Sequence, residues 1–210
     1  MAALTQLEID RLAAAPVPPG KLLIGGQWLE GEAGESEVLS PIDGKRLTTT
    51  ANASAADVGR AVASARASFE SGVWSRMAPA GRKVVLHRLA DLIDKNSLEL
   101  AVLGVRDNGT DIGMAIKAEP GSAAGTFRYY AEAIDKVYGE IAPTAENVLA
   151  LISREPVGVV AAIVPWNFPL MIGAWKIAPA LVAGKSVVLK PAETASLTLL
   201  KLEELAVDAG

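Results

Sequence analysis

Apolar side chains between residues 54 and 137 recur every three or four positions, which is the spacing of one face of an α-helix. Ser54 followed by Asp57 resembles a capping box at the start of the first helix, whose apolar face carries Val58 and Val62. Gly139 is expected just beyond the last helix, because glycine suits a C-terminal cap. The pattern predicts four helices, at residues 54–71, 79–96, 97–108 and 122–137.

The pattern becomes strand-like on both sides of this helical region. Before it, residues 21–27 and 36–40 are predicted as short strands around a turn-rich stretch. After it, residues 148–152 are predicted as a strand, and residues 157–164 are rich in β-branched side chains. The last segment is apolar on both faces, which is typical of an interior strand of a parallel sheet covered by helices.

Residues 157–210 alternate between strand and helix. The first strand is followed by a helix at 170–183, a buried strand at 185–190 and a final helix that Thr194 or Ser196 can cap. This order predicts the opening of a doubly wound α/β sheet. Two strands are too few to complete such a sheet, so we expect an incomplete one.

The composition excludes several classes of protein. The 210 residues include 20 Lys and Arg against 24 Asp and Glu, a net charge of −4, which does not support a surface that neutralises nucleic-acid phosphates. No cysteine is present, so these residues offer no disulfide scaffold, thiolate zinc site or cysteine nucleophile. His87 is the single histidine and lies on the polar edge of the second helical stripe, which favours a solvated helix position over a metal cluster or a histidine-based triad.

The sequence does not favour secretion or a membrane partner. Residues 1–20 lack a basic start and an apolar core, so we expect a cytoplasmic chain. Residues 156–184 carry one charge, Lys176, and pass a crude hydropathy test for a membrane span. Pro165 and Pro169 remove backbone donors there, which favours a buried strand followed by a buried helix.

Polar side chains follow the two predicted parallel strands where each strand ends. Asn167 lies between Pro165 and Pro169 after the first strand, and Lys190 and Glu193 follow the second. The carboxyl edge of an α/β sheet is where such folds bind ligands, so these groups give one crevice both catalytic and cofactor-binding chemistry. The alternative is a rigid turn in which Asn167 satisfies its own backbone.

One long segment carries a specific resemblance to a known family. The run EPVGVVAAIVPWNFPLMIGAWKIAPALVAGKSVVLKPAE, residues 155–193, resembles the aldehyde dehydrogenase superfamily. The resemblance extends upstream through residues 129–140 and, more weakly, from residue 22 onward. The segment YAEAIDKVYGE is similar to bacterial enzymes acting on γ-glutamyl-γ-aminobutyraldehyde. For this chain the resemblance implies an α/β fold with an incomplete doubly wound, Rossmann-like parallel sheet, an amino-terminal hairpin and a helical region.

The resemblance also implies roles for residues at the sheet edge. Asn167 matches the amide that holds the oxyanion of the reacting aldehyde, and Lys176 matches a lysine implicated in proton relay. Lys190 and Glu193 match the pair that binds the adenosine ribose, where an acid favours NAD over NADP. The cofactor-lining positions are matched by Ile163, Val164, Pro165 and Trp166, and the wall of the substrate tunnel by Phe168, Met171 and Trp175.

The same resemblance divides the chain into segments. Residues 1–20 are expected to form an amino-terminal extension, and residues 21–146 the strand pair and helices of the cofactor domain. Residues 147–156 are expected to be a strand of the oligomerisation arm, and residues 157–210 the first half of the Rossmann-like NAD-binding core. The expected partners are a small aldehyde and, for a full-length enzyme, further copies of the chain.

Family members continue well beyond the match to residue 210. The cysteine nucleophile, the glutamate base and the Gly-rich cofactor turn have no counterpart here, and residues 107–111 replace the usual Gly-Lys-Pro. The 210 residues alone are therefore expected to be inactive, because this oxidation needs a thiolate. A noncatalytic assembly module, one half of a split enzyme and a truncated chain are the alternatives, and a separate chain supplying the catalytic part is then the expected partner.

Overall fold

The computed structural model describes residues 5–210. Its helices are α1 (Gln6–Ala14), α2 (Ala55–Ser71), α3 (Pro79–Lys95), α4 (Ser97–Asn108), α5 (Ile112–Ala133), α6 (Pro169–Val182) and α7 (Leu197–Ala209), with a 3-10 turn at Ile134–Lys136. Its strands are β1 (Leu22–Ile24), β2 (Gln27–Leu29), β3 (Glu35–Leu39), β4 (Arg46–Ala51), β5 (Glu140–Ala142), β6 (Ala150–Ile152), β7 (Val159–Ile163) and β8 (Ser186–Lys190).

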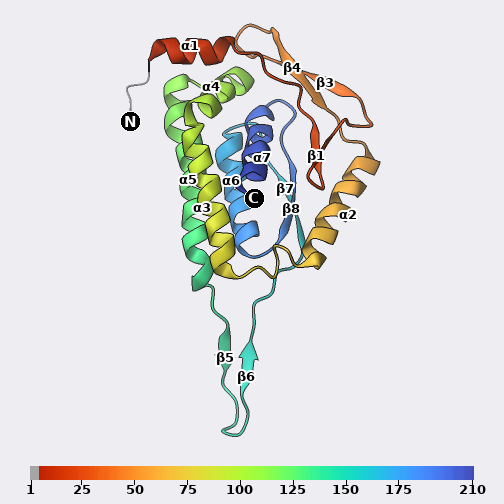
Figure 1. The fold of residues 1–210 in the computed structure, drawn as a ribbon, viewed down its shortest axis with the longest axis vertical. Helices are drawn as coiled ribbons and strands as arrows, with labels where there is room; N and C mark the ends of the chain where they lie inside the picture. The colour runs from red at the N-terminus through yellow and green to blue at the C-terminus, as the bar shows by residue number, and fades with distance from the viewer. Residues whose placement is uncertain (1–4) are drawn as a thin grey trace.

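The elements form layers around the parallel pair β7–β8 (Figure 1). Val159 pairs with Ser186 and Ile163 with Lys190, so the two strands run in the same direction and end side by side. α2 contacts the pair from one side and α6 from the other, and α3, α4 and α5 form a helical block beyond α6. The predicted opening of a doubly wound α/β sheet is therefore present, with β7, α6, β8 and α7 in that order.

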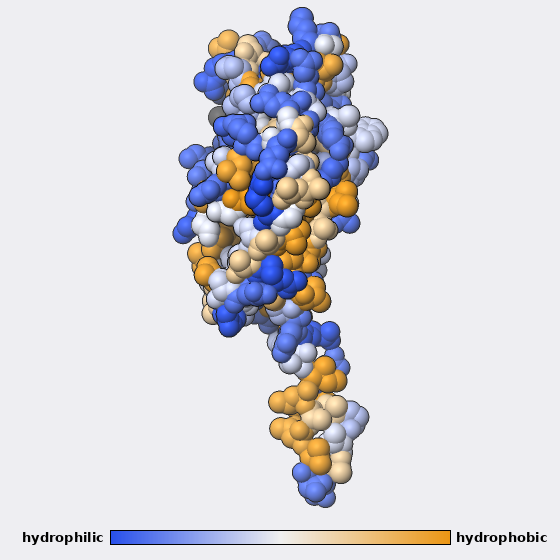
Figure 2. All heavy atoms as spheres, turned by 90° about the vertical axis from the view of Figure 1, so that its right-hand side faces the viewer, coloured by the Kyte–Doolittle hydropathy of each residue, from blue (hydrophilic) through white to orange (hydrophobic). Residues whose placement is uncertain are grey.

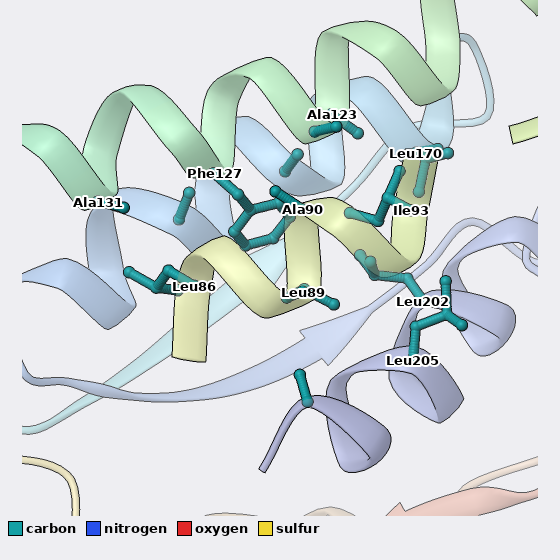
Figure 3. Packing of buried hydrophobic residues seen from close by; sticks show 14 of the residues in the cluster. Leu86, Leu89, Ala90, Ile93, Ala123, Phe127, Ala131, Leu170, Leu202 and Leu205 are labelled. Carbon is teal, nitrogen blue, oxygen red and sulfur yellow. The ribbon is translucent and has the colours of Figure 1, made fainter. Parts of the chain in front are cut away.

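The hydrophobic core lies between this helical block and the helices α6 and α7 (Figure 3). Phe127 of α5, Leu86 and Ile93 of α3, and Leu170 of α6 are fully buried there. Burying a side chain of this size stabilises the fold by about 1.5–3 kcal/mol. The residues from α3 lie on the apolar stripe that the helical period predicts, so the stripe identifies the face that packs.

Most of the predicted helices and the last strand are confirmed. The structure has the helices expected at 54–71, 79–96, 97–108 and 170–183 as α2, α3, α4 and α6, and the strand at 185–190 as β8. The capping box is present, since the Asp57 amide donates to Ser54 Oγ at 3.1 Å and the Ser54 amide donates to Asp57 Oδ2 at 2.8 Å. Gly184 follows α6 with a φ of 76°, as expected of a residue that ends a helix.

The strands near the amino terminus differ from the prediction. The strand expected at residues 21–27 is a hairpin, because Gly25 and Gly26 take φ values of 61° and 77° and turn the chain between β1 and β2. The strand expected at 36–40 is present as β3, and it pairs with β4, which the pattern did not predict. Residues 6–14, expected as part of an extension, form α1 behind a capping box of Thr5 and Glu8.

The fourth helix also differs from the prediction. It begins at Ile112 instead of Ser122. Pro120 lies inside α5, and because a proline usually interrupts a helix, the pattern did not predict the ten residues before Ser122 as helical. Asp111 caps it by accepting a hydrogen bond from the Met114 amide at 3.1 Å. Gly139 was expected to end this helix and does not, since it precedes β5 beside the carbonyl of Ile152.

The exposure of apolar side chains varies along α2 and β7. On α2, Val58 and Val62 are 50% and 45% exposed, whereas Phe69 of the same helix is half-buried. The segment 157–164 was expected to be buried on both faces, yet Ile163 is 72% exposed. None of the helices within residues 5–210 combines the length and the apolar composition that a bilayer span requires.

The antiparallel hairpin of β5 and β6 projects away from the body of the molecule (Figure 1). Ile141 pairs with Leu151, and their side chains are 73% and 69% exposed. The apolar surface of this hairpin is visible in the space-filling view (Figure 2). The strand predicted at 148–152 is thus the second strand of an exposed hairpin, and β5 is an element that the pattern did not predict.

Candidate functional site

The ends of β7 and β8 bring the predicted site residues to one edge of the sheet. At the end of β8, the Val164 amide donates to the Lys190 carbonyl at 3.0 Å, which joins the two chain segments where they leave the sheet. Asn167 follows three residues after Val164, and Glu193 three residues after Lys190. The parallel pairing therefore places the amide-bearing loop and the Lys/Glu pair at the same carboxyl edge.

Asn167 lies in a constrained loop between β7 and α6. Its side chain is exposed and makes no hydrogen bond to any described residue. The alternative turn, in which the Asn167 side chain bonds to its own backbone, is therefore not observed. Phe168, which follows, has φ 52° and ψ 51°, a left-handed conformation that non-glycine residues rarely adopt. Pro169 then begins α6 as its first residue. The loop leaves the Asn167 amide free to donate to a ligand.

The first turn of α6 is capped by a residue far away in the sequence. Phe168 at the N-cap offers no side-chain hydrogen bond. Instead Glu119 of α5 accepts a hydrogen bond from the Met171 amide at 2.9 Å. Burial raises the pKa of Glu119, and hydrogen bonds from the amides of Met171 and Leu170 oppose that rise. The sequence gives little sign of this residue, since Glu119 stands before a proline in a helical stretch.

Lys190 and Glu193 form an ion pair, with Nζ 2.5 Å from Oε1. The hydrogen bond from Lys190 lowers the pKa of Glu193, so this carboxylate is charged at neutral pH. Both side chains are exposed, so the pair is open to a polar ligand. A carboxylate and an ammonium beside each other can accept from and donate to vicinal hydroxyl groups.

The four expected cofactor-lining residues differ in their exposure. Ile163, Pro165 and Trp166 are exposed along the edge of the sheet. Val164 is only 2% exposed and belongs to the hydrophobic core, so its side chain does not face a ligand. The apolar surface beside Lys190 thus comes from the other three residues.

The three expected tunnel residues are not brought together in one pocket. An open pocket of about 390 Å³ is lined by Trp175 of α6 and by residues of α5, namely Ser122, Gly125, Thr126, Tyr129 and Tyr130. Phe168 and Met171 are half-buried and do not line it, and Lys176 is exposed on α6. The α5 side of this pocket is a part of the candidate site that sequence reasoning missed.

A second cavity lies away from this edge of the sheet. A cavity of about 480 Å³ lies between residues 12–21 and helices α4 and α7, and none of the predicted site residues lines it. Residues 5–210 contain no group of three or more His, Asp or Glu side chains that could hold a metal ion.

Comparison with known proteins gives consistent matches. Residues 28–210 match the model of the aldehyde dehydrogenase family. The chain is 47% identical over 191 residues to the NADP/NAD-dependent aldehyde dehydrogenase PuuC of Escherichia coli (strain K12), which covers 90% of this chain and 39% of that protein. The chain thus spans about two fifths of the length of this relative.

Two solved structures superpose closely on the chain. Indole-3-acetaldehyde dehydrogenase in complex with NAD⁺ has a TM-score of 0.95 and 44% identity, over 99% of this chain and 42% of that one. The γ-glutamyl-γ-aminobutyraldehyde dehydrogenase of Burkholderia cenocepacia J2315 gives the same TM-score, identity and coverage. The Rossmann-like α/β fold implied by the sequence is therefore confirmed.

Proposed function

Because the chain belongs to the aldehyde dehydrogenase family, we propose that it supplies the oxyanion-binding and ribose-binding parts of an enzyme that oxidises an aldehyde to a carboxylic acid with NAD. The observation that carries the proposal is the shared edge of β7 and β8. There the free amide of Asn167 and the exposed pair of Lys190 and Glu193 lie on neighbouring chain segments. The same two strands thus position the hydrogen-bond donor proposed for the aldehyde and the ion pair proposed for the ribose of the cofactor.

Asn167 is the proposed catalytic residue within the described chain. When a nucleophile adds to an aldehyde, negative charge develops on the carbonyl oxygen, and a donor already in place stabilises that charge more than it stabilises the substrate. The side-chain N–H of Asn167 is uncommitted, and the strained Phe168 and the first turn of α6 fix the backbone beside it. Lys176, exposed on α6, is the proposed member of a proton relay.

NAD is the proposed cofactor, and its nicotinamide accepts the hydride when bound. Glu193 would accept hydrogen bonds from the adenosine ribose hydroxyls while Lys190 donates to them, and the exposed Ile163 and Trp166 offer apolar surface nearby. A charged Glu193 opposes the extra phosphate of NADP through like charge. The solved relative in complex with NAD⁺ supports this proposal, and the name of PuuC includes both cofactors.

The nucleophile has to come from outside these residues. Residues 1–210 contain no cysteine, so they offer no thiolate for a covalent hemiacetal, and we propose that they are inactive by themselves. The same absence is the observation that favours a noncatalytic assembly module or one half of a split enzyme as the second candidate function. Restoration of NAD reduction by a separate cysteine-bearing chain would favour the split enzyme.

We further propose that β5 and β6 form an arm through which copies of the protein assemble. The hairpin stands apart from the body and carries exposed apolar side chains on both strands (Figures 1 and 2). Exposed apolar surface of this kind marks a protein interface. The occupant that fits best is a second copy, since β-hairpins with identical faces can pack about a two-fold axis.

The proposed function is tested by Asn167→Ala in the enzyme that contains these residues together with the catalytic cysteine. We expect the rate of acylation to fall by about 10²- to 10³-fold, the usual effect of removing one oxyanion donor. The affinity for NAD and the melting temperature should change little. Asn147→Ala, at an exposed asparagine in the turn between β5 and β6, is the matched control. Near-normal acylation in Asn167→Ala, or an equal loss of rate, affinity and stability, would return Asn167 to the role of a turn residue.

A further inference from the structure

Glu119 of α5 links two parts of the candidate site that the sequence keeps 52 residues apart. Its carboxylate accepts hydrogen bonds from the amides of Leu170 and Met171, the second and third residues of α6. We propose that Glu119 is a positioning residue, which holds the start of α6 so that Asn167 presents its amide to the reacting aldehyde. This inference rests on the proposed function of Asn167.

The start of α6 has no capping side chain of its own, so its first amides need hydrogen-bond partners from another part of the chain. The four first amides of a helix have no partner within the helix, and Pro169 removes one of them. Phe168 contributes no cap and holds a left-handed conformation, which is unfavourable for a non-glycine residue and persists only where the surroundings enforce it. The Glu119 carboxyl oxygens accept from two of the remaining amides, the role that a capping side chain has at other helix ends.

Glu119 is itself held rigidly. It is 5% exposed, and α5 packs along α6 through the core, where Phe127 and Ala123 lie near Leu170 (Figure 3). A buried side chain on a packed helix moves little, whereas a capping side chain within the loop would move with the loop. Glu119 thus fixes the position of the Asn167 loop relative to the hydrophobic core.

The same helix forms one wall of the open pocket described above. Ser122, Gly125 and Thr126 of α5 face Trp175 of α6 across that pocket. Since Glu119 joins α5 to the first turn of α6, it fixes the amide of Asn167 and the pocket wall relative to each other. Lys190 and Glu193 belong to β8 and the loop after it, and among the described residues no hydrogen bond or ion pair joins Glu119 to them. The inference therefore predicts a large effect on the rate of acylation and a small effect on the affinity for NAD.

The test compares Glu119→Gln and Glu119→Ala in the cysteine-containing enzyme. Glutamine keeps one acceptor oxygen and replaces the other by an N–H donor, and alanine removes the cap. A misplacement of about 1 Å in a catalytic constellation costs about 10²-fold in rate. We expect single-turnover acylation, per active site, to fall about tenfold for glutamine and about 10²-fold for alanine, with the NAD dissociation constant within about twofold of the wild type. Amide hydrogen exchange at Leu170 and Met171 should accelerate in the same order.

Asp107→Ala is the matched control. Asp107 is also a buried carboxylate, and it caps another helix from a distance by accepting from the Leu197 amide of α7 at 2.8 Å. Its removal should lower the melting temperature comparably while acylation per active site stays within about twofold. The inference would be overturned by normal acylation in both Glu119 variants, or by an equal loss of acylation in Asp107→Ala. A wild type that oxidises no aldehyde would instead overturn the proposed function, and the exchange data would still report on the cap.

Discussion

The exposed apolar hairpin of β5 and β6 yields a quantitative prediction about assembly. Ile141 and Leu151 lie opposite each other on the two strands and are largely exposed. Burial of a leucine or isoleucine side chain is worth about 1.5–3 kcal/mol, so replacing both by threonine removes about 4 kcal/mol from each buried hairpin. Threonine is favoured in strands, so the hairpin itself is retained.

The loss converts into a change in association. At about 1.4 kcal/mol for each factor of ten, 4 kcal/mol weakens association about 10³-fold, and burial of two hairpins about a two-fold axis doubles the free energy and gives about 10⁶-fold. Sedimentation velocity over a concentration series measures the shift from assembled protein to single chains. The matched control is Val58→Thr with Val62→Thr, at exposed apolar residues of α2. Unchanged sedimentation of the Ile141→Thr, Leu151→Thr protein, or equal dissociation of the control, would refute the reasoning.

Two further predictions concern titration and cofactor choice. Burial raises the pKa of Asp107 to about 7 against the ordinary 3.8, and the Leu197 amide opposes the rise, so the folded state binds the proton more tightly than the unfolded state. The free energy of unfolding should therefore fall by about 3 kcal/mol between pH 5 and pH 8 relative to Asp107→Asn, as measured by urea unfolding; identical pH profiles of the two proteins would contradict this. Glu193→Gln should narrow the preference for NAD over NADP, because it removes the charge that opposes the 2′-phosphate, and an unchanged ratio of kcat/KM values for the two cofactors would reject the assignment.

The helices and strands with local signals were predictable from the sequence. The apolar stripe of α3 and the capping box of α2 depend on residues within one or two turns, so their pattern carries the information. The shared edge of Asn167, Lys190 and Glu193 was also predictable, because the ends of adjacent parallel strands necessarily meet. The resemblance to the family then supplied roles for these residues.

Other features were decided only by the tertiary structure. The caps of α6 and α7 come from Glu119 and Asp107, which lie 52 and 90 residues away, and no local pattern shows which distant carboxylate will be buried against a helix end. The pairing of β5 with β6 and the exposure of Val58 likewise depend on what the rest of the chain places beside them. Local periodicity specifies where a segment can form a helix or strand, whereas its partners are determined by the free energy of packing the whole chain, in which contacts far apart in the sequence compete.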